Sequence, residues 1–393
     1  MKKILNHHIS AEKIDWTLLF VTLMLIVFGL IMIYSATISG REMMVVKNAE
    51  GISNALPFHY FKRQLQAFII SALACFVIFQ IPTSFLRKNV PLLLFAVIFL
   101  LLITPFIGKN IGGARRWISI FGFQLQTSEL FKIVCILYIA SAISRRPKIV
   151  QSFKDLPWIA FFPMIGILLT YLTTDLGSCV VVGTVFIGML LLSGLSWKWI
   201  VLSIASSVAL ITLAIHSEEY RMARWNAFLS LLTFKDFFQY AKNTNYQVIN
   251  ALQAIINGSW FGVGLGNSLE RYYIPAMHTD FMLAIIGEEL GVVGIIALIF
   301  VYIWLCIRAF SIGHKAQQNN KTFSSLTAFG IGILITIQSF FHIGVNLGIL
   351  PTKGLTLPFI SYGGSSLLVT MIAITILLRI DYENRRQMRG FKV

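Results

Sequence analysis

Ten long runs of apolar residues limit, more than any other feature, what this chain can fold into. Each run has 17 to 29 residues, which is enough for a helix to cross the hydrocarbon core of a bilayer. Inside lipid, backbone polar groups must be bonded within their own segment, so we expect every run to be a helix. The predicted spans are residues 16–35, 64–81, 89–106, 128–144, 157–173, 176–194, 197–216, 280–308, 323–347 and 362–379.

The composition supports the same fold class. Hydrophobic residues make up 57% of the 393 residues and charged residues 12%, whereas soluble domains carry about 25% charged residues. We therefore predict a single all-α polytopic membrane domain over residues 1–393, with no soluble domain. The net charge of +16 is spread over short loops, which indicates topology and contact with anionic lipid rather than nucleic-acid binding.

The distribution of basic residues predicts the orientation. Lys and Arg are more frequent on the side that holds both termini once the long loop 217–278 is discounted, so we expect both termini in the cytoplasm. Loop 217–278 would then be a large extracytoplasmic loop, either lying in the headgroup layer or packed over the helices. The first apolar run is too long for a signal peptide core and is read as a retained span. The four cysteines lie in apolar runs, which favours unpaired buried thiols.

Four clusters of unusual residues emerge on the outer face of this topology. In the first cluster, Arg115 and Arg116 follow a glycine pair and could hold a phosphate group together. Glu129 and Lys132 come next and share a helix face near a membrane boundary. The alternative for this cluster is an ion pair within one helix, beside arginines that only set the topology.

The second cluster is Asp175, at the junction of two spans, and the third runs from the glycine-rich segment 262–268 to Asp280. Both aspartates could simply cap helices. Glu288 and Glu289 follow about two turns deeper along the next span. Because an intramembrane carboxylate is costly, these glutamates require partners or a wet cavity.

The fourth cluster is the segment 346–366, in which prolines and glycines interrupt the helix repeatedly. Irregular backbone at membrane depth occurs against protein or a water-filled cavity, and Lys353 within the segment could meet a phosphate or a glutamate. A purely structural re-entrant loop is the alternative. Together, the four clusters favour a polar cavity for a lipid with a phosphate-bearing, sugar-like head, and leave open whether the lipid is moved or reacted.

At these clusters the chain resembles the SEDS family of bacterial shape, elongation, division and sporulation proteins. The resemblance is carried by residues 113–117, 278–281, 287–291 and 351–366. The Pro-Thr-Lys-Gly-Leu-Thr-Leu-Pro stretch at 351–358 is similar to the division (FtsW-like) branch rather than the elongation branch.

The resemblance implies an enzyme, a peptidoglycan glycosyltransferase that polymerises lipid II during cell division. It also implies a class B penicillin-binding protein as the cross-linking partner, other division membrane proteins, and a place in the bacterial cytoplasmic membrane at the septum. The family's essential aspartate falls on Asp280 and its important lysine on Lys353. A lipid II flippase and a non-catalytic division scaffold remain as alternatives.

The resulting mechanistic hypothesis makes Asp280 the general base for an inverting sugar transfer. Fixed cations would stabilise the leaving pyrophosphate, and a divalent cation such as magnesium or manganese could assist them, although no cofactor or metal ligand is assigned. The predicted substrate-binding residues are Arg115, Arg116, Lys132, Lys353, Glu129, Asp175, Glu288, Glu289, His278 and Ser365.

Overall fold

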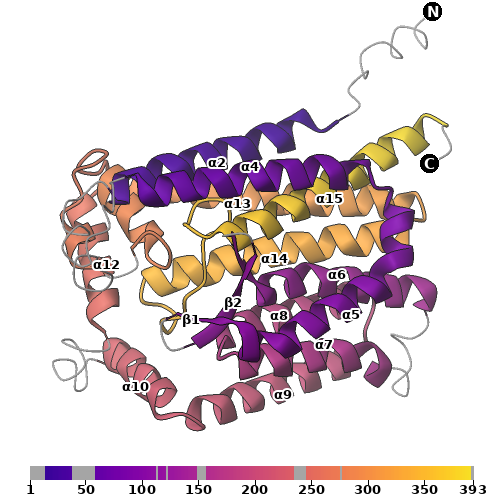
Figure 1. Ribbon diagram of the computed structural model, residues 1–393, viewed down its shortest axis with the longest axis horizontal. Coiled ribbons are helices and arrows are strands. Elements are labelled where there is room, and N and C mark those ends of the chain that lie inside the picture. Colours follow the sequence, from indigo (N-terminus) through magenta and orange to yellow (C-terminus); the bar gives the residue numbers. More distant parts are fainter. Residues whose placement is uncertain are drawn as a thin grey trace, which may run out of the picture.

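Helices make up most of the computed structural model, which describes residues 14–37, 58–111, 114–120, 123–147, 156–233, 245–274 and 277–390. The apolar helices are α2 (Trp16–Thr37), α4 (His59–Gln80), α5 (Thr83–Ile107), α6 (Thr127–Arg145), α7 (Leu156–Leu172), α8 (Leu176–Leu192), α9 (Trp197–His216), α13 (Met282–Gln318), α14 (Thr322–Asn346) and α15 (Gly364–Met388). They run side by side along the long axis of the molecule (Figure 1).

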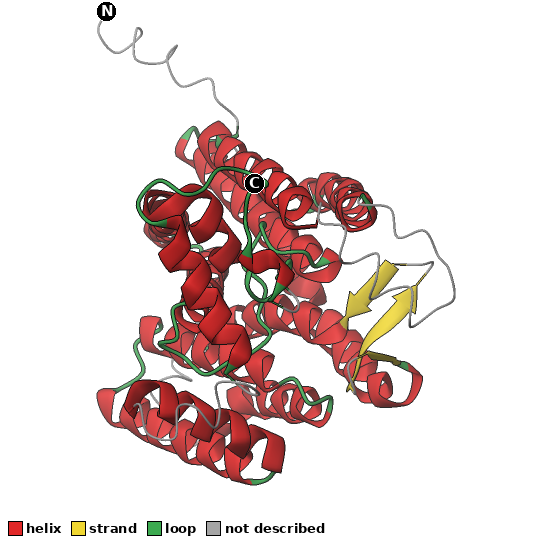
Figure 2. Cartoon of the chain, turned by 90° about the vertical axis from the view of Figure 1, so that its left-hand side faces the viewer, coloured by secondary structure: helices red, strands yellow, loops and turns green. Residues whose placement is uncertain are grey.

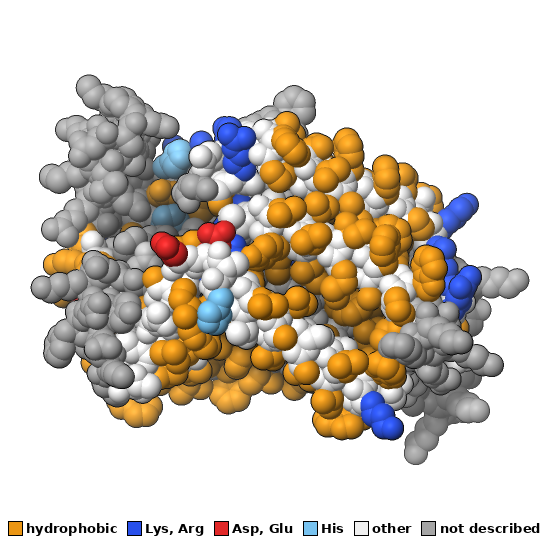
Figure 3. Space-filling model, turned by 90° about the horizontal axis from the view of Figure 1, so that it is seen from below, with side chains coloured by type: hydrophobic (Ala, Val, Ile, Leu, Met, Phe, Trp, Pro, Cys, Tyr) orange, Lys and Arg blue, Asp and Glu red, His pale blue; other side chains and the backbone are white. Residues whose placement is uncertain are grey.

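These helices confirm the predicted all-α membrane fold. Within the described residues, eight of them are long and apolar enough to cross a membrane, while α7 and α8 are shorter apolar helices of 17 residues each. Each matches one of the ten predicted spans, and several continue beyond the apolar run at one end. Apolar side chains cover the middle of the surface in Figure 3, as expected for a protein whose surrounding solvent is lipid.

The two ends of the bundle differ. Helix α2 begins and α15 ends at the same end of the bundle (Figure 1). An ion pair at this end joins Arg308 of α13 to Asp15, just before α2, at 2.6 Å, and a second ion pair, Arg385–Asp381 at 2.5 Å, lies within α15. At the opposite end lie α10 (Glu219–Thr233) and α12 (Tyr246–Gly258). We call this opposite end the loop end.

The long segment 217–278, which the sequence predicted to be one large extracytoplasmic loop, contains the helices α10 and α12 among its described residues. A short 3-10 helix, η2 (Glu270–Tyr272), follows them. In α12 the buried positions are Val248, Ala251 and Ala254, which recur at helical spacing and form one apolar face. Helix α12 packs this face against α13, so the alternative of a segment packed over the helices holds for this part.

A three-stranded antiparallel sheet at the loop end is the other departure from the prediction. It is formed by β1 (Lys109–Ile111), β2 (Ala114–Ile120) and β3 (Phe123–Gln126), in the order β1-β2-β3. Trp117 pairs with Lys109 on one side and with Gln126 on the other. Figure 2 shows the sheet at one edge of the bundle. The strands place residues 114–120 and 123–126 in a fixed geometry between α5 and α6.

Helix α13 is broken at Gly291, whose φ of 71° and ψ of −173° are not helical. The backbone groups released there are bonded by the glycine-rich segment 258–264: the Val263 N–H donates to the Glu288 carbonyl at 2.9 Å and the Val292 N–H donates to the Ser259 carbonyl at 2.9 Å. Broken helices in membranes need such partners. Gly262 therefore has a structural role, because a Cβ atom on it would lie 2.2 Å from the Glu289 carbonyl oxygen and the two backbones could not approach so closely.

Gly258 is the tightest of these contacts and allows a direct test. A Cβ atom on it would lie 1.9 Å from the Gly287 carbonyl oxygen, whereas a Cβ on Gly183 of α8 would meet nothing within 4 Å. We expect Gly258→Ala to lower stability by about 1–3 kcal/mol, since backbone would have to move. Thermal unfolding in detergent measures this effect, with Gly183→Ala as the matched control. Equal melting temperatures for the two variants would contradict the close packing of α12 on α13.

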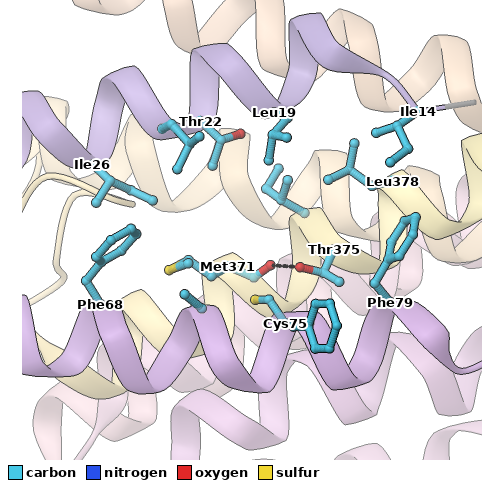
Figure 4. Close-up of a pocket in the computed structure, with 14 residues that line it drawn as sticks. Ile14, Leu19, Thr22, Ile26, Phe68, Cys75, Phe79, Met371, Thr375 and Leu378 are labelled. Atoms are coloured by element: carbon cyan, nitrogen blue, oxygen red, sulfur yellow. Dashed lines mark hydrogen bonds between the residues drawn. The ribbon is translucent and has the colours of Figure 1, made fainter. Parts of the chain in front are cut away.

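The described cysteines are all unpaired, as predicted, and two of them, Cys135 and Cys179, are buried. Cys75 lines an apolar cavity of about 310 Å³ between α2, α4 and α15 (Figure 4). Leu19 and Leu378 also line it, which places the cavity toward the end where α2 begins. It lies apart from the polar clusters and is not a candidate for the predicted site.

Candidate active site

Arg115 and Arg116 point to different partners, because successive side chains of a strand face opposite sides. Arg116 donates from Nε to the Thr173 carbonyl at 3.1 Å and from Nη2 to the Thr174 carbonyl at 2.7 Å. Arg115 is turned to the end of α5, with Nη1 3.3 Å from the Pro105 carbonyl oxygen. The prediction that both arginines hold one phosphate together is therefore corrected: only Arg116 faces the junction of α7 and α8.

Asp175 joins the sheet, α6 and α8 at that junction. Its Oδ2 accepts hydrogen bonds from Ser128 Oγ at 2.7 Å and Gln126 Nε2 at 3.0 Å. Its Oδ1 accepts from the Ser178 N–H at 3.2 Å and so caps α8. The charge of Arg116 favours its carboxylate. Asp175 is thus a helix cap, as one reading proposed, and also a partner of the site's arginine.

Glu129 and Lys132 form the predicted ion pair inside α6. Lys132 Nζ lies 2.7 Å from Glu129 Oε1, and the two side chains are only 1% and 6% exposed. Lys132 Nζ also donates to Gln338 Oε1 at 3.4 Å, and Gln338 Nε2 donates to the Thr356 carbonyl at 3.1 Å. A buried ammonium that is already paired supports neighbouring groups rather than offering a free charge to a ligand. The pair therefore supports the segment that carries Lys353.

Asp280 lies just before α13, half-buried, with its carboxylate against the backbone of the Lys353 segment. A Cβ atom on Gly354 would be 3.0 Å from Asp280 Oδ2, so glycine is what admits the carboxylate here. Burial raises the pKa of Asp280 to about 6, against a hydrogen bond from Thr279 and the charges of Arg224 and Arg116. A carboxylate of this kind is suited to accept a proton near neutral pH.

Lys353 belongs to the same electrostatic neighbourhood. Burial lowers its pKa to about 8, and the charges of Arg224, Arg221 and Arg116 act in the same direction, while Asp175 opposes them. Arg116 and Arg224 thus influence both the lysine and Asp280. Three segments distant in sequence, the sheet, the 280 turn and the 351–363 segment, bring these groups together. The site contains more positive than negative charge and is suited to an anionic ligand.

Arg221 and Arg224 of α10 are the site residues that the sequence analysis missed. Arg221 is only 4% exposed, and its Nη1 donates to Tyr171 Oη at 2.7 Å and to the Ala214 carbonyl at 3.0 Å. Arg224 is exposed. The signal was available, because two arginines three residues apart share one helix face, but it is visible only if 219–233 is recognised as a helix.

Glu288 and Glu289 do not join this group through any bond of the described residues. Glu288 accepts hydrogen bonds from the Ser268 hydroxyl and from the Leu269 N–H, the latter at 2.9 Å. Both Glu289 oxygens accept from Ser35 Oγ, at 2.7 and 2.6 Å. These bonds fasten the 262–272 segment and α2 to the broken helix α13. A role of either glutamate in substrate binding stays a prediction.

His278 and Ser365 have packing and anchoring partners. The His278 ring lies 4.3 Å from the Tyr60 ring and 5.5 Å from the Tyr362 ring, centroid to centroid. Burial lowers the pKa of His278 to about 4, so the ring is neutral at physiological pH. Ser365 Oγ accepts from the Gln126 N–H at 2.8 Å and so ties α15 to β3. Direct contact of either residue with a substrate stays a prediction.

A metal ion held by protein groups alone has no evident ligand set in the part of the chain that the structure describes. No three His, Cys, Asp or Glu side chains gather there in a way that could hold one. Magnesium is commonly bound by one or two carboxylates together with substrate phosphates. Asp280, the half-buried carboxylate among these cations, could act as such a ligand only jointly with a pyrophosphate.

Comparison with known proteins identifies the lineage. The family model described as cell cycle protein, for FtsW, RodA and SpoVE, matches residues 16–386. A probable peptidoglycan glycosyltransferase FtsW of Neisseria gonorrhoeae is 40% identical over 98% of this chain and 88% of its own length. The FtsW of Thiomonas intermedia bearing the same description is 40% identical over 96% of this chain and 90% of its own.

Solved structures share the fold. One of them has a TM-score of 0.75 at 24% sequence identity, and the match covers 94% of this chain and 98% of the other. It is described as structural coordination of polymerization and crosslinking by a peptidoglycan synthase complex. The rod shape determining protein RodA of Thermus thermophilus has a TM-score of 0.65 at 22% identity, over 96% and 99% of the two chains. The sequence relatives are named as glycosyltransferases, which confirms the class of enzyme expected from the sequence. The chain therefore belongs to the FtsW, RodA and SpoVE family of cell cycle proteins.

Proposed function

We propose that this protein polymerises lipid II into glycan strands at the outer face of the bacterial cytoplasmic membrane during cell division. The observation that carries the proposal is Asp280, a half-buried carboxylate with a raised pKa, packed against Gly354. It lies under the influence of the cations Arg116 and Arg224, which also act on Lys353. One base beside several cations is the arrangement needed to transfer a sugar from a pyrophosphate.

In the proposed reaction, the C4 hydroxyl of an acceptor N-acetylglucosamine attacks the anomeric carbon of a donor N-acetylmuramic acid. Asp280 takes the hydroxyl proton as the new glycosidic bond forms, because an unaided sugar hydroxyl is a poor nucleophile. The bond to undecaprenyl pyrophosphate breaks, and its electron pair leaves with the pyrophosphate. Direct displacement with one carboxylate as base inverts the anomeric centre, as in inverting glycosidases.

The cations act on the leaving group. Negative charge grows on the pyrophosphate in the transition state, and fixed positive groups that need no rearrangement lower the barrier. Arg116 is held by the carbonyl groups of residues 173–174, and Lys353 is placed by the segment that Gln338 fastens. Asp175 and the Glu129–Lys132 pair maintain this arrangement from behind.

The rate of glycan synthesis should have a bell-shaped dependence on pH. The base must be ionised, so activity rises as pH increases through about 6, the pKa of Asp280. The lysine must be protonated, so activity falls as pH increases through about 8, the pKa of Lys353. Measuring kcat/KM for glycan synthesis between pH 5 and 9.5 reports both groups in the free enzyme.

Lys353→Arg isolates the alkaline side of this profile. An arginine stays charged throughout the measured range, so we expect the fall near pH 8 to disappear while the rise near pH 6 remains. A falling side that persists unchanged in the Lys353→Arg protein would assign it to another group.

The placement in the cell is part of the proposal. Lys and Arg residues are enriched at the end where α2 begins and α15 ends, which supports cytoplasmic termini and an outer-face site. Division at the septum, a class B penicillin-binding protein as partner, and other division membrane proteins are proposed from the family. The complex described for the structural relative couples polymerisation to crosslinking, which supports a cross-linking partner here.

The test is synthesis of glycan from labelled lipid II by the purified protein in vesicles, with and without its class B penicillin-binding protein. Polymer that requires this protein supports the proposal. Lipid II that crosses the vesicle bilayer without forming polymer would instead identify a flippase. Neither product, together with retained partner binding, would identify a scaffold.

A further inference from the structure

Asn346, the last residue of α14, uses every polar atom of its side chain to connect α14 with the turn that carries Asp280. The side chain is 0% exposed. Its Nδ2 donates to the Asp280 carbonyl at 3.0 Å and to the His342 carbonyl at 2.8 Å. Its Oδ1 accepts from the Ala284 N–H at 3.1 Å. The amide thus contacts the chain on both sides of the start of α13.

This contact replaces an ordinary helix cap. The first N–H groups of a helix need acceptors, which the side chain of the N-cap residue often supplies. In α13 the N-cap is Phe281, which has no capping side chain. The Ala284 N–H is shared between the Phe281 carbonyl and Asn346 Oδ1, each at 3.1 Å, so that Asn346 supplies a side-chain acceptor from another helix.

Other contacts also hold the turn that carries Asp280, but Asn346 is bonded to the backbone of Asp280 itself. The Tyr362 N–H donates to the His278 carbonyl at 2.8 Å, which fixes the start of the turn. Gly354 limits the space on one side of Asp280 Oδ2. The bond from Asn346 to the Asp280 carbonyl holds the backbone at the residue that carries this carboxylate.

We propose that Asn346 is a positioning residue for the base: it caps α13 from α14 and holds the backbone of Asp280 so that its carboxylate faces the acceptor hydroxyl. The inference rests on the proposed sugar transfer and deepens it. Misplacement of a catalytic group by about 1 Å can cost about 100-fold in rate, so the amide should affect turnover more than substrate binding.

Asn346→Leu tests the role by removing both hydrogen-bonding functions at similar size. We expect kcat for glycan synthesis to fall about 10- to 100-fold with KM for lipid II nearly unchanged. Asn250 supplies the matched control, because its Nδ2 also donates to a backbone carbonyl, that of Tyr273 at 3.3 Å, but from an exposed position. Asn250→Leu should leave kcat unchanged.

Asn346→Asp gives a readout that a packing role would not move. A protonated carboxyl group keeps the acceptor and one of the two donors that the amide supplies here, whereas an ionised carboxylate only accepts. While the buried acid is protonated, it should restore part of the activity that Asn346→Leu loses. As pH rises and the acid ionises, its activity relative to the wild type should fall. The wild type and the Asn346→Asp protein share the other charged and titratable groups that face this turn. The ratio of their activities therefore reports on position 346 alone. The shared groups are Asp280, His278, His342, Lys353, Arg116 and Arg224.

The outcomes separate the inference from the proposed function. If the wild type makes glycan, two results would overturn the positioning role alone. One is an unchanged kcat of the Asn346→Leu protein. The other is a ratio of Asn346→Asp activity to wild-type activity that stays low at every pH. Thermal unfolding of each variant identifies a loss of folding. The change of relative activity with pH is measured on the folded Asn346→Asp protein, so a constant loss of folded protein cannot produce it. A wild type that makes no glycan overturns the proposed function, and the positioning role with it.

Discussion

Asp280→Asn is expected to abolish glycan synthesis while leaving a protein that inserts and folds. Asparagine has the same shape as aspartate but cannot accept the hydroxyl proton, and general-base catalysis typically contributes about 10²–10⁴-fold. The side chain would still fit against Gly354, whose missing Cβ makes room for it. The measurement is the initial rate of polymer formation from purified lipid II, at the wild type's optimal pH.

Glu219→Gln is the matched control for this change. Glu219 is an exposed carboxylate in the first turn of α10, at the same end of the molecule, and its neutralisation should leave the rate unchanged. Both variants should retain thermal stability in detergent and binding of lipid II. Polymerisation by the Asp280→Asn protein at more than about a tenth of the wild-type rate would remove Asp280 from the role of base.

Lys353→Met is the second change with a large expected effect. Methionine keeps much of the side chain's length but removes its positive charge from the leaving pyrophosphate. Removing one group that stabilises a developing oxyanion typically costs about 10²–10³-fold in kcat. We expect a loss of this order, measured as kcat under saturating lipid II.

The control for the lysine is Lys109→Met, an exposed lysine of β1 at the same end of the molecule. Its rate should remain that of the wild type. If Lys353→Met loses activity only in proportion to a lower melting temperature, the lysine supports the fold of segment 351–363 and has no role at the pyrophosphate.

The helices were largely predictable from the sequence, because lipid leaves a backbone few alternatives. The same argument does not apply outside the bilayer, and the departures occur there. Helices α10 and α12 lie in segment 217–278, for which the sequence left open whether it lies in the headgroup layer or packs over the helices. The three-stranded sheet was not predicted, because β1, β2 and β3 are short and lie in a polar loop.

The convergence of the site was predictable in part. Intramembrane topology brings the 280 turn, the α7–α8 junction and segment 351–363 to one face. There Asp175 acts electrostatically on Lys353, and Arg116 and Arg224 act on both Lys353 and Asp280. Side-chain direction was not predictable. Whether Arg115 points with Arg116 depends on the backbone being a strand.

Glu288 and Glu289 show the same limit. A buried carboxylate must have partners, and the sequence analysis correctly required them. The partners are the backbone N–H of Leu269 and the hydroxyl groups of Ser268 and Ser35, which are neutral groups from segments far along the chain. Charge pairing alone could not identify them, because the broken helix α13 and its glycine-rich neighbour create the contact.

A structure of the Asp280→Asn protein with lipid II bound tests most directly whether base and cations face a single substrate. The proposed site predicts the acceptor's C4 hydroxyl at hydrogen-bond distance from residue 280, with the donor's pyrophosphate against Arg116 and Lys353. A sugar head bound elsewhere, such as beside Glu288 and Glu289 or in the apolar cavity between α2, α4 and α15, would contradict it.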